Sequence, residues 1–204
     1  YSVGILAVHG KDWNCDFITG SGHKSMAASG PIGVLGCKEE YREILTAPSK
    51  LKGNITNKAY PNKSFSYLGC PAVYGAPLAT LMASFPDVVA RTQPDVVADE
   101  SKKANYLIDE LKKIEGINVL GKLPKVHPLT NIETPGFLAA AETHPRKGFF
   151  VREGFIKRGI IGMAPGRSKK IKFSTYGLSW DQVKKVADAF KELAKECNLY
   201  IGTN

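Results

Sequence analysis

Hydrophobic and polar positions in the first part of the chain predict strands and helices in alternation. Apolar runs over residues 15–19 and 31–37 predict two strands, the first of them buried and followed by the glycine-rich turn Gly20-Ser21-Gly22. The pattern over residues 38–46 predicts a short helix, and the apolar run over 72–85 predicts a buried helix. Strands and helices that follow one another in this way indicate an α/β fold.

The second part of the chain carries clearer periodic signals. Residues 101–114 predict an amphipathic helix with Ala104, Leu107, Ile108 and Leu111 on one face. The start of a last helix is marked by the capping-box pattern Ser179-Trp180-Asp181-Gln182. The apolar face expected on that last helix consists of Val183, Val186, Ala187, Phe190, Leu193, Ala194 and Cys197. Short strands are expected at 118–120, 129–133 and 170–174, and a further helix at 147–158.

Polar and proline-rich segments divide the chain. Residues 48–66 are rich in Lys, Asn, Ser and Gly and predict a long surface loop. Prolines interrupt the pattern around residues 90–96, which predicts a boundary between a domain at 1–92 and a domain at 93–204. The first domain has the α/β pattern, and the second has an α+β pattern.

Composition narrows the classes of protein. The 204 residues are 43% hydrophobic, and no apolar run approaches the roughly 18 to 20 residues of a membrane-spanning helix. The net charge of +9 favours an anionic partner such as nucleic acid, phosphate or a membrane surface, although solubility alone explains it equally well. Four dispersed cysteines without a CxxC pair indicate neither a zinc site nor a disulfide framework. With no secretory leader visible, we expect a reducing, cytoplasmic setting.

The densest candidate chemistry surrounds Lys24. A lysine just past a strand end, in a turn lined by glycine, can be held close to a ligand, and Ser21, His23 and backbone amides could donate hydrogen bonds to a phosphate. Partial withdrawal of such a lysine from water lowers its pKa and makes its amine a nucleophile. An ordinary surface lysine fits the same spacing, so the pattern alone leaves both interpretations open.

The residues around this lysine resemble a known family. The run Gly20-Ser21-Gly22-His23-Lys24-Ser25 and the Gly-Pro-x-Gly strand at 30–33 resemble the lysine region of fold-type-I pyridoxal-phosphate enzymes, in the branch of class-V aminotransferases and cysteine desulfurases. The longer string 20–31 is similar to the O-phosphoseryl-tRNA:cysteinyl-tRNA synthase family. Further matching blocks lie at 67–70, 80–86 and 172–179. The resemblance therefore covers most of the chain.

The resemblance implies a fold, a cofactor and an assembly. Residues 1–92 would be the end of the large pyridoxal-phosphate-binding domain, and residues 93–204 the small C-terminal domain. The aromatic, acidic and phosphate-binding groups that complete such a site lie upstream of the lysine in this fold. We therefore expect the chain to correspond to the C-terminal half of a larger subunit, with little activity alone. A homodimer with the active site at the subunit interface is also implied.

The resemblance also implies roles for individual residues. Lys24 would bind pyridoxal 5′-phosphate covalently, and Ser21, Gly22 and His23 would contact it. Cys70 would carry sulfur as a persulfide, since a thiol near a cationic cofactor ionises readily, whereas a small buried apolar role is its alternative. The other cysteines are expected to be structural, and no metal site is expected. A phosphate of the substrate would bind Arg167 or Lys169, although a solvated basic turn explains these two residues equally well.

The implied reaction converts O-phosphoseryl-tRNA(Cys) to cysteinyl-tRNA(Cys) by elimination of phosphate and addition of sulfur. Phosphoseryl-tRNA synthetase and a sulfur donor would be further partners. The first alternative is a cysteine desulfurase or selenocysteine-lyase-like enzyme acting on a free amino acid. Desulfurases carry a reactive cysteine on a late loop, and residues 120–148 contain none, which favours the tRNA enzyme. The last alternative is a non-catalytic RNA-binding fragment that uses the basic residues Arg146, Lys147, Arg152, Lys157, Arg158 and 167–172.

Overall fold

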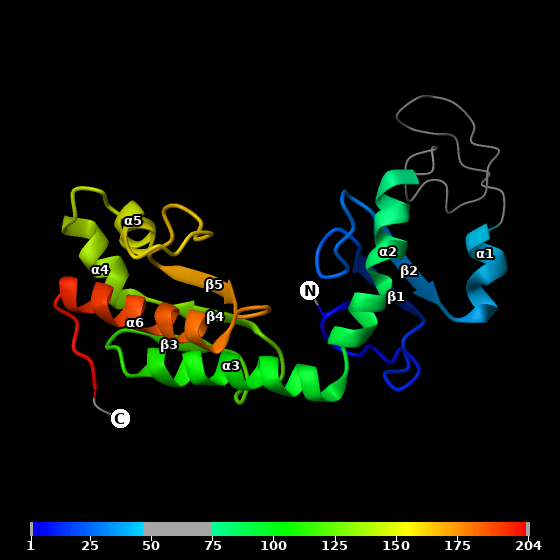
Figure 1. Ribbon diagram of the computed structural model, residues 1–204, viewed down its shortest axis with the longest axis horizontal. Coiled ribbons are helices and arrows are strands. Elements are labelled where there is room, and N and C mark those ends of the chain that lie inside the picture. Colours follow the sequence, from blue (N-terminus) through cyan, green and yellow to red (C-terminus); the bar gives the residue numbers. More distant parts are fainter. Residues whose placement is uncertain (1, 47–74, 203–204) are drawn as a thin grey trace. The chain divides into compact units, whose positions relative to one another are not determined.

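The computed structural model describes residues 2–46 and 75–202 in two compact units, Tyr1–Gln93 and Pro94–Asn204 (Figure 1). The division lies between two long helices, α2 (Gly75–Arg91) and α3 (Pro94–Lys112). The loop expected at 48–66, the cysteine at position 70 and the start of the helix expected at 72–85 lie outside the described residues.

The first unit contains a two-stranded antiparallel sheet followed by a short helical segment. Strand β1 (Phe17–Ser21) pairs with β2 (Gly33–Cys37), and the register places Ser21 opposite Gly33. The helix expected at 38–46 is confirmed as a 3-10 turn, η1 (Glu39–Tyr41), that continues into α1 (Arg42–Thr46).

The prediction that the first strand is buried is wrong. Phe17 and Thr19 are exposed, and the other residues of β1 are only half-buried. Within the described residues β1 pairs with a single strand, and Phe17 stays exposed although its ring lies 5.0 Å from the ring of Tyr41. Gly20 and Ser21, expected in the turn, belong to the strand.

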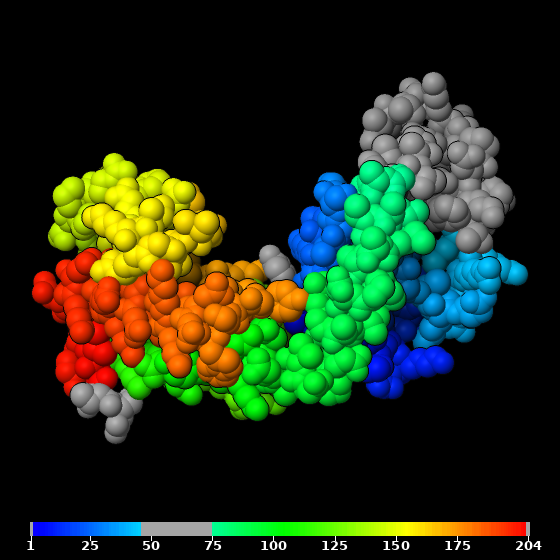
Figure 2. Space-filling model, viewed as in Figure 1, coloured from blue at the N-terminus to red at the C-terminus, as the bar shows by residue number. Residues whose placement is uncertain are grey.

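The expected helix is present as α2, but it is mostly exposed and extends beyond its expected end. It continues to Arg91, through Pro86, and its one buried residue is Val88. The space-filling view shows α2 at the surface of the molecule (Figure 2). An apolar stripe along this helix, at the i, i+4, i+7, i+11 spacing of one helical face, is exposed: Leu78, Met82, Phe85 and Val89.

The second unit packs helices on a three-stranded antiparallel sheet of order β3-β4-β5 (Figure 1). Ile132 of β4 lies opposite Ile171 of β5 in the register, and both are buried. The three strands occupy the positions expected from the sequence. The helix expected at 147–158 is also confirmed, although it begins two residues later and ends one residue earlier than expected. The elements are β3 (Asn118–Leu120), β4 (Leu129–Glu133), α4 (Pro135–Thr143), α5 (Phe149–Lys157), β5 (Lys170–Ser174) and α6 (Trp180–Glu196).

Helices α3 and α6 present the faces that the sequence predicts. The four apolar residues expected on the face of α3 are each at most 1% exposed. The capping box of α6 is present, with the Ser179 hydroxyl accepting from the Gln182 amide at 3.2 Å and the Gln182 side chain accepting from the Ser179 amide at 2.8 Å. On the predicted face of α6, Val186 and Cys197 are only partly buried.

Ion pairs connect the helices of this unit. The Glu110 carboxylate of α3 accepts hydrogen bonds from Lys113, at 2.8 Å, and from Lys191 of α6. These two ammonium groups lower the pKa of Glu110. The Arg158 guanidinium, just after α5, contacts Glu192 at 2.7 Å and Glu196 at 2.6 Å, which connects it to α6. No helix within the described residues is long and apolar enough to cross a membrane.

Candidate functional site

The end of β1 and the turn after it bring four of the predicted site residues together: Ser21, Gly22, His23 and Lys24. Lys24 is exposed, three residues beyond the end of the strand, and its amide donates to the Ser21 carbonyl at 3.3 Å. The Ser21 hydroxyl lies 3.2 Å from Nδ1 of His23, within hydrogen-bond distance. Lys24 and Ser21, with Thr19, Gly20 and the chain at residues 2–3, line an open pocket of about 460 Å³. Lys24 and Ser21 thus line the pocket, and His23 is connected to it through its contact with Ser21.

Gly22 is required by packing in this turn. Its amide donates to the Ile32 carbonyl at 2.7 Å, and its carbonyl accepts from the Ala28 amide at 2.8 Å. A Cβ atom on Gly22 would lie 2.4 Å from Cγ2 of Ile32, a distance that real Cβ contacts do not show. Gly22 therefore lets the chain turn back on itself beneath Lys24. Its direct contact with a cofactor stays a prediction.

Helix α2 fixes the segment that follows Lys24. The Ser84 hydroxyl donates to the Met26 carbonyl at 2.6 Å, and the Ser29 amide donates to the Thr80 hydroxyl at 2.9 Å. Between these contacts Ala27 has a φ of 59°, which alanine rarely adopts. The hydrogen bonds on both sides hold this strained residue in place.

Thr80 and Ser84 are two residues of the site that the sequence did not predict. They lie one helical turn apart on α2, on a different face from the exposed apolar stripe. Two hydroxyl residues at i, i+4 in an otherwise apolar run were the available signal, because a polar side chain on such a helix usually has a partner. They are positioning residues for the lysine turn.

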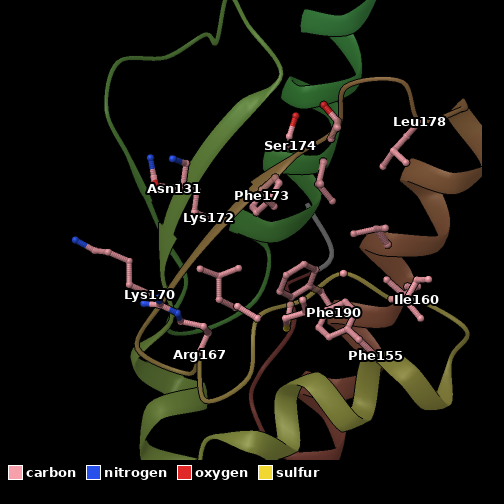
Figure 3. A pocket seen from close by; sticks show the side chains of 18 residues that line it. Asn131, Phe155, Ile160, Arg167, Lys170, Lys172, Phe173, Ser174, Leu178 and Phe190 are labelled. Carbon is pink, nitrogen blue, oxygen red and sulfur yellow. The ribbon is translucent and has the colours of Figure 1, made fainter. Parts of the chain in front are cut away.

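The second unit holds the two residues predicted to bind a substrate phosphate. Arg167 lines a cavity of about 710 Å³ (Figure 3), whereas Lys169 does not. Lys169 is exposed, and its backbone carbonyl accepts from the Thr134 amide at 3.0 Å. Lys24 belongs to the first unit, whereas Arg167 and Lys169 belong to the second.

The cysteines differ from the expectation in one respect. Cys37 is exposed at the end of β2, so it does not have the apolar surroundings expected for it, and its structural role stays a prediction. Cys15 and Cys197 are partly buried thiols, and burial raises the pKa of Cys197. Cys70 lies outside the described residues. Within residues 2–46 and 75–202, no cluster of His, Cys, Asp and Glu side chains has the grouping of a metal site.

The steric account of Gly22 predicts a specific loss of stability. Gly22→Ala should lower the free energy of unfolding of the first unit by about 1–3 kcal/mol, because the new methyl group overlaps Ile32. The matched control is Gly33→Ala, where nothing lies within 4 Å of the added Cβ, and its cost should stay below about 1 kcal/mol. Urea titration followed by Trp13 fluorescence, in a Trp180→Phe background, measures both. Equal losses at the two glycines, or an undiminished loss when Ile32→Ala is added, would contradict the account.

Comparisons with known proteins identify relatives of nearly the whole chain. It is 44% identical over 201 residues to an O-phospho-L-seryl-tRNA:Cys-tRNA synthase 2 of Archaeoglobus fulgidus, which covers 98% of this chain and 51% of that protein. A crystal structure of a SepCysS–SepCysE N-terminal domain complex superposes with a TM-score of 0.80 at 44% identity, covering 97% of this chain and 50% of the other. The chain thus spans about half the length of these relatives.

More distant structures share the fold. The apo structure of a cysteine desulfurase from Thermococcus onnurineus NA1 matches with a TM-score of 0.63 at 17% identity, over 96% of this chain and 51% of that one. The expected fold-type-I, α/β architecture is thereby confirmed. The family model of the class-V aminotransferases matches residues 2–144, and this chain belongs to that family.

Proposed function

We propose that this chain provides the cofactor lysine of a pyridoxal-phosphate enzyme that converts O-phosphoseryl-tRNA to cysteinyl-tRNA. The observation that carries the proposal is the likeness to the synthase of Archaeoglobus fulgidus, which at 44% identity extends over 98% of the chain, Lys24 turn included. The ordered turn and the open pocket beside Lys24 support it. The class-V family is typically dependent on this cofactor.

The residues beside the pocket fit the two reactive ends of the cofactor. The Lys24 amine suits an aldehyde, while the Ser21 hydroxyl and the His23 imidazole suit a phosphate. When bound, pyridoxal phosphate supplies an electron sink for the negative charge that develops at a substrate α-carbon. Gly22 and α2 hold the lysine turn in the conformation that presents these groups.

Lys24 is proposed to act as the base once its amine is free. The amine takes the proton from the α-carbon of the phosphoseryl group, and the phosphate leaves from the β-carbon with the electron pair of the broken C–O bond. Donated sulfide then adds to the β-carbon, and the α-carbon regains a proton, which gives the cysteinyl ester. Cys70 is proposed to carry sulfur on a second route, as a persulfide that receives its outer sulfur from a sulfane-sulfur donor. That outer sulfur bonds to the β-carbon, and a thiol reductant then breaks the S–S bond, which releases the cysteinyl ester and restores the Cys70 thiol. Arg167 or Lys169 is proposed to hold a substrate phosphate.

The assembly is part of the same proposal. Residues 1–92 would belong to the large domain and 93–204 to the small domain of a homodimer with its active site at the subunit interface. The tRNA(Cys) that carries phosphoserine, its synthetase and a sulfur donor would be the partners. Because the solved relative was crystallised with the N-terminal domain of SepCysE, a protein of that kind is a further candidate partner.

Chemical labelling tests the role of Lys24 on the chain as it stands. Incubation with pyridoxal phosphate, borohydride reduction and peptide mapping should place the cofactor mass preferentially on the Lys24 peptide, because neighbouring groups hold the phosphate there. Lys24→Arg should remove this label. The control Lys11→Arg changes an exposed lysine of the same unit that does not line the pocket, and it should leave the Lys24 label unchanged. Label spread evenly over exposed lysines would contradict the assignment.

A chimera tests the reaction itself. In it, this chain replaces the matching half of the Archaeoglobus fulgidus synthase, and we expect it to form cysteinyl-tRNA from phosphoseryl-tRNA and sulfide. Lys24→Arg should reduce turnover by at least about a thousandfold, because it removes the base and the cofactor linkage together. Release of sulfide from free cysteine, with no product on tRNA, would support the desulfurase alternative and overturn the proposal.

A further inference from the structure

The cavity in the second unit is predominantly apolar. Among the residues that line it, Arg167 alone has been given a proposed role above. It has a volume of about 710 Å³, within the range of roughly 300–1,000 Å³ that small-molecule sites occupy. Its floor is formed by side chains of the core, and one wall by the chain between α5 and β5 (Figure 3). The apolar lining includes Phe155, Ile160, Ile161, Met163, Phe173 and Phe190.

One apolar residue of the wall, Ile161, is uncovered within the described chain, whereas Phe155 and Phe190 of the same lining are buried in the core. Ile161 lines the cavity, yet its side chain is 86% exposed, the largest exposed fraction among the large hydrophobic residues of the described chain. An occupant of the cavity would cover it and remove apolar area from water, which favours binding.

The rim of the same cavity is basic. Arg167, Lys170 and Lys172 all line it and are exposed, and Lys170 also lies 3.4 Å from Glu133. The surrounding stretch, residues 144–172, holds nine Lys or Arg residues and one acidic residue. An apolar interior with a cationic rim selects a ligand that has an apolar body and anionic groups outside it.

Polar groups at the sheet edge further restrict the class of ligand that fits the cavity. Asn131 lies opposite Lys172 in the β4–β5 register, and both line the cavity together with Ser174. An amide and a hydroxyl can pair with the donor and acceptor edge of a nucleobase, which a simple hydrocarbon chain lacks. The flat faces of the base would lie against apolar side chains, and the flanking phosphates against the cations.

From these features we infer that the cavity binds the unpaired base at the 3′ end of an RNA strand, with the adjoining phosphates on Arg167, Lys170 and Lys172. This inference rests on the proposed function, in which the substrate is attached to the end of a tRNA. It adds a binding site for the terminal nucleoside in the second unit. Ile161 is its apolar anchor, and Arg167 is one of its phosphate contacts.

Binding of a short RNA to the full 204-residue chain tests the inference. The probe is a 5′-fluorescent single strand ending in CCA, compared with the same strand whose last nucleotide lacks its base. Removal of the base should raise Kd about tenfold, in the range expected for loss of one stacked base. Ile161→Glu should raise the Kd of the intact strand by a similar factor and make the two strands bind equally.

Two matched control variants distinguish RNA binding in the cavity from general attraction of RNA to the basic surface. Val126 is 66% exposed and does not line the cavity, so Val126→Glu should leave the preference for the intact strand unchanged. Arg167→Ala should lower the slope of log Kd against log salt by about one, because one phosphate contact is lost. Lys122→Ala, at an exposed lysine outside the cavity, should leave that slope unchanged. Circular dichroism checks that each variant is folded.

The outcomes distinguish this inference from the proposed function. Equal binding of the two strands by the unaltered chain, or equal effects of Ile161→Glu and Val126→Glu, would overturn it and leave only phosphate attraction. Oleate binding that Ile161→Glu abolishes, with no RNA binding, would overturn it in favour of a fatty-acid ligand. Lys24 labelling and the chimera's turnover need no preference for the terminal base, so those results can stand while this inference fails.

Discussion

The hydrogen bonds from Ser84 and Thr80 of α2 to the segment after Lys24 are the contacts on which the candidate site depends. They are made to the backbone of Met26 and Ser29, at 2.6 and 2.9 Å, and they enclose the strained Ala27. Met26 and Ala28 of this segment are buried, and the two hydrogen bonds add to that packing in compensating the cost of ordering the turn. Lys24 is thereby carried on a defined backbone beside an open pocket.

The two units carry different kinds of candidate binding surface. The first holds an amine, a hydroxyl and an imidazole on the turn after β1, which suits a covalently bound aldehyde cofactor with a phosphate. The second holds an apolar cavity with a cationic rim on a well-packed core. The proposed cofactor lysine and the proposed RNA contact are therefore assigned to different units.

Local signals account for what the sequence predicted correctly. The faces of α3 and α6 and the capping box at Ser179 depend on residues three or four apart, so they are readable without a fold. The site residues at 21–24 could be predicted because they are consecutive in the sequence. Helix α4 was missed because it begins with Pro135-Gly136 directly after a strand and then runs through three alanines, which give no amphipathic pattern.

Burial and long-range contacts could not be predicted in the same way. The exposure of β1 and of the apolar stripe on α2 depends on which elements pack against them, and a hydrophobic run does not specify its partner. The roles of Thr80 and Ser84 need contacts across more than fifty residues, since Ser84 reaches Met26 and Thr80 reaches Ser29. The cavity beside Ile161 likewise gathers residues from Leu107 to Phe190.

Hydrogen exchange at the amides of Ala28 and Ser29 tests most directly whether α2 orders the lysine turn. In the double variant Thr80→Val and Ser84→Ala, these amides should exchange on the order of tenfold faster, since two hydrogen bonds of about 0.5–1.5 kcal/mol each are lost. Thr92→Val, which removes a hydroxyl bonded only within the end of α2, should leave them unchanged. Exchange at Ala28 and Ser29 that is the same in the double variant and the unaltered chain would contradict the account.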